Sequence, residues 1–206
     1  MQNFVIEKAT QKDLNSILNI TKDALNSMKA MNFNQWDEHY PNEEIFKEDI
    51  KAQELYLYKA MNFNQWDEHY PNEEIFKEDI KAQELYLYKE KDEILGFICI
   101  NEKFEPEFYE QINFKKSYNN LAFYLHRLAV KENAKGKGVA QKLLNFCETY
   151  AKNEGKYSLR ADTHSKNIPM NSLFKKLNFE FCGAFHIPCY EDEFFAYEKI
   201  LNQKAF

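Results

Sequence analysis

Short apolar runs alternate with amphipathic stretches along most of the chain, which is typical of an α/β domain. The predicted strands cover residues 4–6, 54–59 or the identical 84–89, 94–100, 121–130, 157–163, 180–185 and 194–201. The predicted helices begin near residues 10, 42, 139 and 169, and residues 102–120 are expected to form a loop. The order β-α-α-β-β-β-α-β-α-β-β predicts an α/β (α+β) fold, with a mixed central sheet flanked by helices.

The chain contains a perfect internal repeat, because residues 29–59 and residues 59–89 have the same sequence and share Lys59. Two copies without one substitution indicate a recent or engineered duplication, since an old repeat architecture needs three or more units. One 30-residue repeat unit, in which the shared lysine counts once, has a net charge of −4, so the chain without one unit would have 176 residues and a charge of −2. We predict a single domain over residues 1–206 in which one copy, an inserted α/β segment, is surplus to the fold.

Only one copy can supply the strand beside residues 94–100. Residues 84–89 reach that strand through a short turn, whereas residues 54–59 would place more than 30 residues inside the hairpin. We therefore predict that residues 84–89 form the strand and that the surplus comes mostly from the first copy. We predict that the surplus keeps its helix near residues 43–51 and covers its apolar face either against the domain or against a second chain, in a homodimer that could exchange this segment.

Composition excludes several classes of protein. A chain of 206 residues with 44% hydrophobic and 16% aromatic residues can bury a core, and its net charge of −6 argues against general nucleic-acid binding. No apolar run reaches the ~18–20 residues that span a bilayer, and the first residues do not resemble a secretory signal. The four cysteines form no C-x-x-C pair, which predicts reduced thiols in a cytoplasmic protein and no metal site.

A glycine-containing turn joins the predicted strand 121–130 to the next helix. Gly136 and Gly138 let the backbone approach a ligand closely, while the helix that follows directs its free N–H groups and positive dipole end to the same point. Lys135, Lys137 and Lys142 add positive charge. The turn suits a pyrophosphate, although a plain strand-to-helix turn can have the same residues, and the spacing fits neither a Walker P-loop nor a dinucleotide fingerprint.

The stretch LAV…KGKGVA resembles motif A of the GNAT superfamily of N-acetyltransferases, with Gly138 and Ala140 at its small-residue positions and Lys135 in place of the usual Arg or Gln. Residues 162–183 resemble the second segment of the family, and more closely a bacterial branch with Asp-Thr-His-x-x-Asn-x-x-Met. The similarity covers nearly the whole 176-residue unit. It implies a GNAT-like fold, acetyl-CoA as co-substrate without a metal, and transfer of acetyl to an amine of a small molecule or peptide.

The resemblance also implies which residues contact acetyl-CoA. They are Leu128, Ala129, Val130, Lys135, Gly136, Lys137, Gly138, Val139, Ala140, Asn167 and Phe174. A backbone N–H around residues 128–130 would polarise the thioester carbonyl. Phe174 stands where many relatives have a tyrosine that protonates the leaving thiolate, so Tyr190 and Tyr197 are the candidates for that role. Asn178 replaces a usual glycine and is expected to form a left-handed helix cap.

Strand alternation predicts the faces on which polar residues lie. We expect one shared face for Tyr124, His126, Leu128 and Val130, and another for Ser158, Arg160, Asp162 and His164.

Three of these residues are candidate catalytic groups. His126 and His164 are candidate bases, because an unperturbed imidazole titrates near neutral pH, and Tyr124 could position a water or act as an acid. Each histidine could equally be a satisfied side chain at a strand end, and Asp162 better suits a structural partner of His164 or of backbone N–H groups. If a histidine is the base, its alanine variant should lose ~10²-fold in turnover.

The resemblance places the acceptor wall in the repeated segment, with Trp66 and Tyr70 as substrate-binding residues or their copies Trp36 and Tyr40. Packing of two helices onto the sheet explains these aromatic residues equally well. We expect a cytoplasmic N-acetyltransferase with no nucleic-acid or membrane partner. The alternatives are a CoA-binding module with little turnover, which Phe174 favours, and an engineered duplication that serves as a folding probe.

Overall fold

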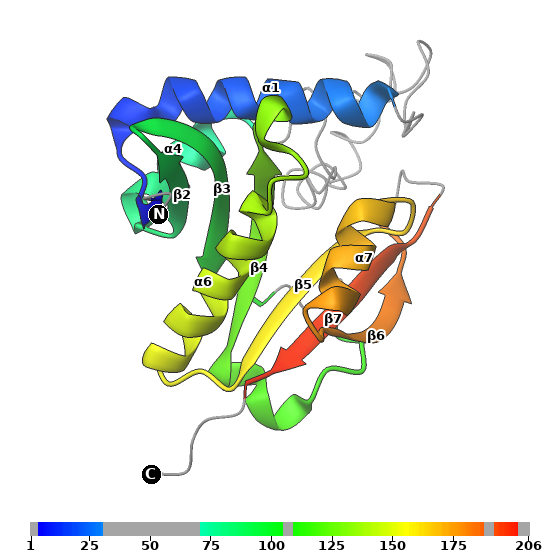
Figure 1. Cartoon of the computed structure of the whole chain (residues 1–206). Helices are drawn as coiled ribbons and strands as arrows, with labels where there is room; N and C mark the ends of the chain where they lie inside the picture. Colours follow the sequence, from blue (N-terminus) through cyan, green and yellow to red (C-terminus); the bar gives the residue numbers. More distant parts are fainter. Residues whose placement is uncertain (1–3, 31–70, 105–108, 188–191, 202–206) are drawn as a thin grey trace, which may run out of the picture.

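The computed structural model describes residues 4–30, 71–104, 109–187 and 192–201 (Figure 1). The strands are β1 (Phe4–Lys8), β2 (Leu85–Glu90), β3 (Glu93–Asn101), β4 (Ala122–Val130), β5 (Ser158–His164), β6 (Glu180–Phe185) and β7 (Phe194–Ile200). The α-helices are α1 (Leu14–Ala30), α4 (Glu73–Ala82), α6 (Val139–Asn153) and α7 (Ile168–Lys176). Three short 3₁₀ helices are η1 (Gln11–Asp13), η2 (Lys116–Leu121) and η3 (Glu132–Ala134). Within these ranges the order of strands and α-helices is the predicted one, and η2 replaces the end of the predicted loop.

The strands form one mixed sheet in the order β1-β2-β3-β4-β5-β7-β6. Neighbouring strands are antiparallel except for β4 and β5, which are parallel and are connected through α6. This arrangement confirms the predicted mixed central sheet flanked by helices.

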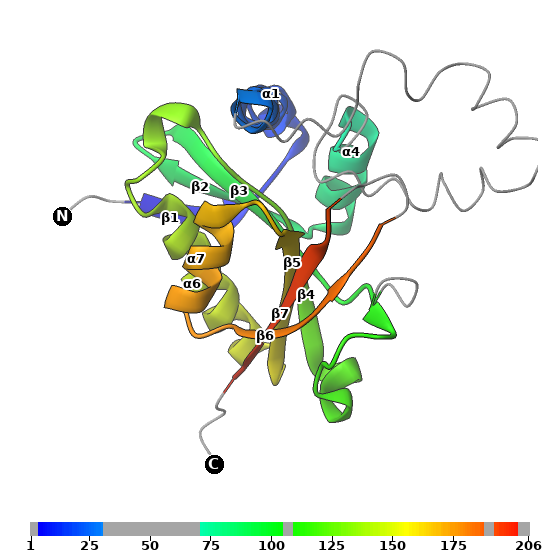
Figure 2. The same ribbon diagram turned by 90° about the vertical axis from the view of Figure 1, so that its right-hand side faces the viewer.

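The helices cover both faces of the sheet (Figure 2). On one face α6 and α7 pack on β2 to β5 and β7, with Leu143 and Phe174 in the shared core. On the other face α1 and α4 pack on β2 and β3, through residues such as Ile17 and Phe76. A third cluster lies beside β4 and β7, where residues 109–114 contribute Tyr109, Ile112 and Phe114. In the described ranges, no helix is long and apolar enough to cross a bilayer.

Helix ends follow the capping signals in the sequence. The Thr10 N–H donates to Asp13 Oδ2 (2.9 Å) before α1, and Asn72 Oδ1 accepts the Ile75 N–H (3.1 Å) at the start of α4. After α7, Asn178 has a φ of 61°, which confirms the expected left-handed cap.

The second copy of the repeat supplies the strand beside β3, as predicted. β2 pairs with β3 from Leu85↔Cys99 to Glu90↔Glu93 through a two-residue turn. Both turn residues, Lys91 and Asp92, have positive φ values (49° and 66°), which is the backbone of a type I′ hairpin turn. The predicted helix near residue 42, the strand at 54–59 and the fate of the surplus copy lie outside the described residues.

β4 contains a β-bulge that overturns one prediction about its faces. The register with β3 moves from Phe97↔Ala129 to Cys99↔His126, so two steps on β3 match three on β4. Arg127, inside the bulge, has a φ of 49°. The single shared face predicted for Tyr124, His126, Leu128 and Val130 is therefore wrong. Leu128 and Val130 pack with the α6 core, and Tyr124 belongs to the cluster on the opposite face.

A buried ion pair ties this bulge to α4. Arg127 donates to both oxygens of Asp79, through Nε to Oδ2 (2.8 Å) and through one terminal nitrogen to Oδ1 (2.7 Å). Both side chains are almost fully buried. Removing one partner of such a pair leaves an uncompensated buried charge.

The duplication provides a matched control for this ion pair. Asp49 stands in the first copy where Asp79 stands in the second. We expect Asp79→Ala to lower the free energy of unfolding by about 3–5 kcal/mol, because Arg127 is left unpaired. Asp49→Ala should change it by less than about 0.5 kcal/mol. Urea unfolding of both variants checks this, and equal losses would contradict the assignment of the second copy to the fold.

Candidate functional site

The sheet opens between its two parallel strands. β4 pairs with β5 only from Ala122↔Ser158 to Leu125↔Ala161. Beyond that point β4 stays paired with β3 as far as Val130, and β5 stays paired with β7 as far as His164. The two strands diverge there (Figure 1), so the edge of β4 that faces β5 is open over residues 126–130.

The N-terminus of α6 follows directly from this open part of β4. Gly136 and Gly138 have φ values of 74° and 80°, and Gly138 is the N-cap residue. The Lys142 N–H donates to the Gly138 carbonyl (3.0 Å), so the first-turn amides before Lys142 have no intrahelical acceptor. A Cβ atom on either glycine would meet no atom within 4 Å. The loop therefore offers free N–H groups to open space, which fits an anionic group of a ligand.

Two of the three predicted lysines already have partners. Lys135 Nζ lies 2.6 Å from Glu132 Oε2, and Lys142 Nζ donates to the Tyr88 hydroxyl (2.7 Å). Lys137 forms no ion pair with the described part of the chain. Its charge adds to the positive end of α6.

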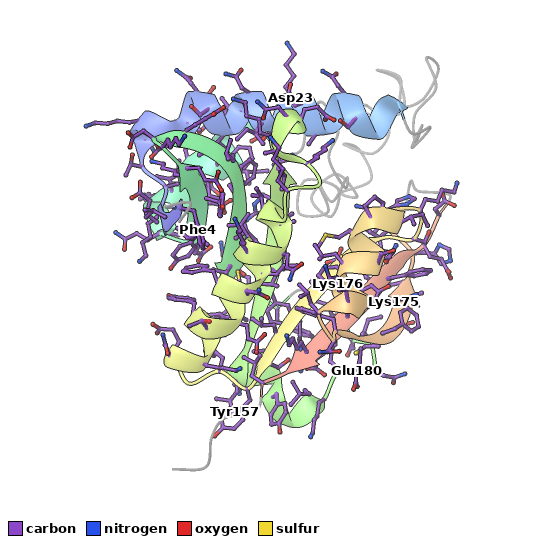
Figure 3. The ribbon with its side chains drawn as sticks, viewed as in Figure 1. Phe4, Asp23, Tyr157, Lys175, Lys176 and Glu180 are labelled. Atoms are coloured by element: carbon purple, nitrogen blue, oxygen red, sulfur yellow. The ribbon has the colours of Figure 1, made fainter. Side chains whose placement is uncertain are left out.

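The second segment that is predicted to contact acetyl-CoA forms the start of α7. Asn167 Oδ1 accepts the Met170 N–H (3.2 Å) as the N-cap of that helix. Lys176, at the other end of α7 (Figure 3), donates to Gln141 of α6 (3.0 Å), which links the two helices on this face.

Phe174 is only 2% exposed and packs between Phe179 and Tyr197, each with a ring centroid 5.0 Å away. The Tyr197 hydroxyl donates to Asn171 Oδ1 (2.8 Å). Of the two tyrosines considered as the thiolate acid, Tyr197 is thus buried beside Phe174, and Tyr190 lies outside the described residues. Trp66 and Tyr70, and their copies Trp36 and Tyr40, lie outside them as well.

A buried arginine holds Tyr124 in place on the face opposite α6. Arg160 is fully buried and donates to Glu198 (2.8 Å), to the Tyr124 hydroxyl (2.8 Å) and to the Lys115 carbonyl (3.0 Å). Burial raises the pKa of Tyr124, although the bond from Arg160 opposes this effect. Tyr124 therefore stays protonated at neutral pH.

The two candidate histidines differ in their surroundings. His126 lies one residue beyond the last β4–β5 pair, and its Nε2 is shielded from solvent without a hydrogen-bond partner in the described chain. Burial, with Arg127 and Lys103 nearby, lowers the pKa of His126 to about 3. His164 Nδ1 accepts the Lys166 N–H (3.1 Å), and its ring packs edge-on against Phe194. Burial also lowers the pKa of His164.

Asp162 has a partner that the sequence did not indicate. Its Oδ1 accepts a hydrogen bond from the hydroxyl of Tyr109, so the expected bonds to His164 or to backbone N–H groups are not its observed contact. Tyr109 lies in a stretch without periodicity that was predicted as a loop. No sequence signal placed this tyrosine beside β5.

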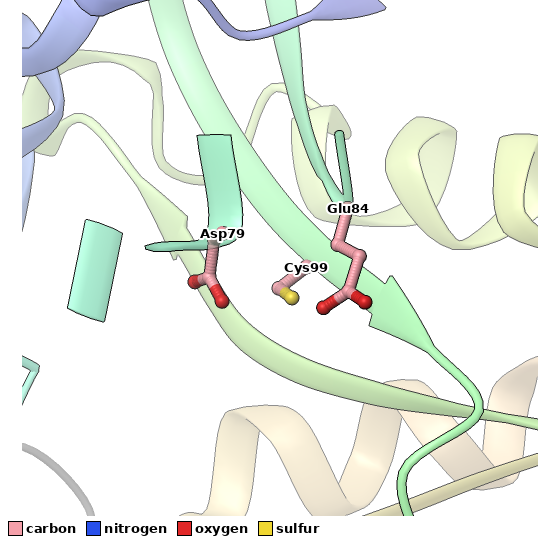
Figure 4. Close-up of side chains that lie close together, drawn as sticks. All are labelled: Asp79, Glu84 and Cys99. Atoms are coloured by element: carbon pink, nitrogen blue, oxygen red, sulfur yellow. The ribbon is translucent and has the colours of Figure 1, made fainter. Parts of the chain in front are cut away.

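Asp79, Glu84 and Cys99 also lie close together (Figure 4), with one ligand atom from each within 4.8 Å of the others. Arg127 donates to both Asp79 oxygens and lies 3.1 Å from Cys99 Sγ, and Lys103 Nζ lies 3.2 Å from Glu84 Oε2. Protein cations therefore already balance the charge of this cluster, and it supports no metal site.

Comparison with known proteins gives the class of the chain. Residues 36–179 match the sequence profile of the acetyltransferase (GNAT) family. The chain belongs to this family, since the match covers more than half of its length.

Individual relatives agree with this assignment. Streptothricin acetyltransferase of Escherichia coli is 28% identical over 85 residues, which are 41% of this chain and 48% of that protein. The uncharacterized N-acetyltransferase YesJ of Bacillus subtilis (strain 168) is 32% identical over 63 residues, which are 31% of this chain and 35% of that protein. The matched segments thus span about half or less of these relatives.

Solved structures match over nearly the whole chain. A candidate acetyltransferase of Staphylococcus aureus Mu50 has a TM-score of 0.64 and 26% identity, covering 96% of this chain and 99% of that one. A GNAT family acetyltransferase of Listeria monocytogenes 4b F2365 has a TM-score of 0.65 and 18% identity, covering 96% and 95%. A Salmonella typhimurium protein solved with its cofactor acetyl-CoA has a TM-score of 0.63 and 14% identity, covering 99% and 97%.

The glycine loop can be tested with a control at the other end of α6. Gly138→Val adds a side chain where a phosphate would approach, so CoA affinity should fall more than tenfold, about 1.4 kcal/mol. Gly155, just beyond α6, also has positive φ (71°) and open space around a Cβ atom, so Gly155→Val imposes the same backbone strain elsewhere. Calorimetric titration with CoA should show the loss for Gly138→Val alone, and equal affinities in the two folded variants would contradict the placement.

Proposed function

We propose that this acetyltransferase uses acetyl-CoA and transfers the acetyl group to a primary amine. The observation that carries the proposal is the continuity between the open edge of β4 and the free amides at the start of α6. The free amides at the start of α6 suit a pyrophosphate, and the open edge of β4 suits a thioester. Acetyl-CoA has both groups, joined by an extended pantetheine arm.

The donor site uses the residues that the resemblance implies. Of the amides of residues 135–140, those of Lys135 and Lys137 already donate to the Glu132 and Ala134 carbonyls (3.2 and 3.3 Å), so the remaining ones would bind the pyrophosphate. The open edge at residues 128–130 would hold the pantetheine. A backbone N–H on that edge would stabilise the negative charge that develops on the thioester oxygen. The Salmonella relative solved with acetyl-CoA supports this choice of donor.

The acceptor enters from the face opposite α6, because the donor occupies the α6 side of the opening. An alkylammonium group, with a pKa near ~10.4, must lose a proton before its nitrogen can attack. His126, His164 and Tyr124 lie on β4 and β5 beside this face and remain the predicted catalytic residues. Trp66 and Tyr70 remain the predicted acceptor wall, and cytoplasmic location and a homodimer remain predictions too.

The direct test incubates the protein with acetyl-CoA and a panel of amines and follows thiol release. The panel includes amino acids, a polyamine, a lysine peptide and streptothricin, because the E. coli relative is named as a streptothricin acetyltransferase. We expect at least one amine to stimulate thiol release well above the rate without acceptor. CoA binding without release for any amine would support the alternative of a CoA-binding module.

Alanine variants test the histidines separately. A general base contributes ~10²–10⁴-fold when its pKa lies near the working pH. Since burial lowers the pKa of His126 to about 3, we expect His126→Ala to lose less than ~10²-fold in kcat at pH 7.5. Burial also lowers the pKa of His164, and His164→Ala tests that histidine in the same assay. A loss of ~10²-fold or more with unchanged CoA affinity would instead identify that histidine as the base.

A further inference from the structure

The carboxylate of Asp162 lies where the sheet opens. Ala161 is the last β5 residue paired with β4, and Asp162 is the next residue. Its alternation partner Arg160 contacts Tyr124 and Phe114, which places Asp162 on the face opposite α6. This is the face from which the acceptor would reach the thioester.

The contacts of Asp162 orient the carboxylate without neutralising it. Its Oδ1 accepts the hydroxyl hydrogen bond of Tyr109, and the residue is mostly buried but keeps some exposed surface. No lysine, arginine or histidine of the described chain forms an ion pair with Asp162. One carboxylate oxygen is therefore fixed by a neutral donor, and the group keeps its negative charge for a positively charged partner.

Aromatic rings surround the tyrosine that holds Asp162. The Tyr109 ring stacks on Tyr124 with centroids 5.8 Å apart and meets Phe114 and Phe185 edge-on at 5.5 and 5.7 Å. Phe104 is 39% exposed, and its ring centroid lies 6.1 Å from that of Tyr109. Aromatic faces beside a carboxylate are the chemistry that recognises an organic ammonium group.

We propose that Asp162, oriented by Tyr109, binds the ammonium group of the acceptor and accepts its proton. This inference rests on the proposed function and assigns one step of it. The Asp162 carboxylate takes one proton from R–NH₃⁺, and the freed electron pair forms a bond to the thioester carbonyl carbon. The C–S bond then breaks, a second proton passes from nitrogen to the leaving sulfur, and Asp162 releases its proton to water. The products are R–NH–acetyl and CoA thiol.

The charges on this face suit such a role. Burial raises the pKa of Asp162 to about 6, although the bond from Tyr109 opposes the rise. The carboxylate is thus mostly ionised at neutral pH and becomes protonated as the pH falls through about 6.

The other ionisable side chains around Asp162 compete little for the same proton. On β4 they are Tyr124, whose pKa is raised, and His126, whose pKa is lowered to about 3. On β5 they are Arg160, which is paired with Glu198, and His164, whose pKa is lowered. β7 places Ala196 opposite Asp162, and the segment 109–115 contributes Tyr109.

The test compares Asp162→Asn with the wild type over pH 5 to 9, using an amine that is active in the panel. Asparagine keeps an oxygen for Tyr109 but accepts no proton. We expect kcat/KM for the amine to fall ~10²-fold or more at pH 7.5, with CoA affinity and melting temperature nearly unchanged. The wild-type profile should level off above about pH 6, whereas the variant should gain about tenfold per pH unit, because only free amine reacts.

Three further measurements separate proton transfer from a structural role. Hydroxylamine is already unprotonated at pH 7.5, so its thiol release should change less than threefold in Asp162→Asn. Tyr109→Phe removes the bond that lowers the pKa of Asp162. The acidic limb of the profile, which is the fall of kcat/KM at low pH, should therefore move to higher pH. The variant Asp23→Asn, on α1, should leave that limb in place.

Two results would overturn the proposal, and they are distinguishable. If the wild type acetylates an amine and Asp162→Asn does so at a similar rate with the same acidic limb, Asp162 is not the proton acceptor, while the proposed function stands. If the wild type binds CoA but transfers acetyl to no amine and not to hydroxylamine, the proposed function itself fails, and this inference fails with it.

Discussion

One extra residue in β4 determines which groups face each side of the opening. The bulge at Arg127 reverses the alternation of side chains, so the strand presents Leu128 and Val130 to α6 while His126 keeps the face of Tyr124. A positive φ at a non-glycine residue costs of order 1–3 kcal/mol and persists only where surrounding contacts impose it. Here the contacts come from Asp79, on a helix far away in the sequence. The geometry of the opening thus depends on an ion pair that lies outside it.

Two buried arginines brace opposite sides of the same region. Arg127 connects β4 to α4, and Arg160 connects β5 to β7 and to the segment before η2. Buried ion pairs give little net stability, because desolvation offsets most of the attraction. Their bonds are directional, however: Arg127 fixes β4 beyond the last β4–β5 pair, and Arg160 fixes β5 within the paired part, next to the point where the strands diverge. Rigid walls of this kind are what a site needs for aligning two reactants.

The elements could be predicted from the sequence because each carries local signals. Asn72 before Glu73 and Glu74 starts α4, Asn178 ends the turn after α7, and the short connection after residue 89 selects the second copy for the sheet. The glycine loop was predictable for the same reason, since its chemistry lies within a few consecutive residues. The faces of β4 were not, because a bulge arises from tertiary contacts. The contact of Asp162 with Tyr109 was not predictable either, because Tyr109 lies 53 positions away in a stretch without periodicity.

The tight turn at Lys91 and Asp92 also bears on how quickly a chain with a duplicated segment can fold. Hairpins closed by such turns form in about 1–10 μs, and loop closure becomes slower as the intervening chain lengthens. When β3 leaves the ribosome, β2 is separated from it by two residues, and the identical residues of the first copy lie 30 positions further away. Pairing of β3 with the nearer segment is therefore favoured both in rate and at equilibrium. The β2–β3 hairpin keeps the short closure that it would have in the 176-residue unit. The duplication instead lengthens the connection between β1 and β2, which pair from Phe4↔Glu90 to Lys8↔Tyr86, because the surplus copy adds 30 residues between these two strands.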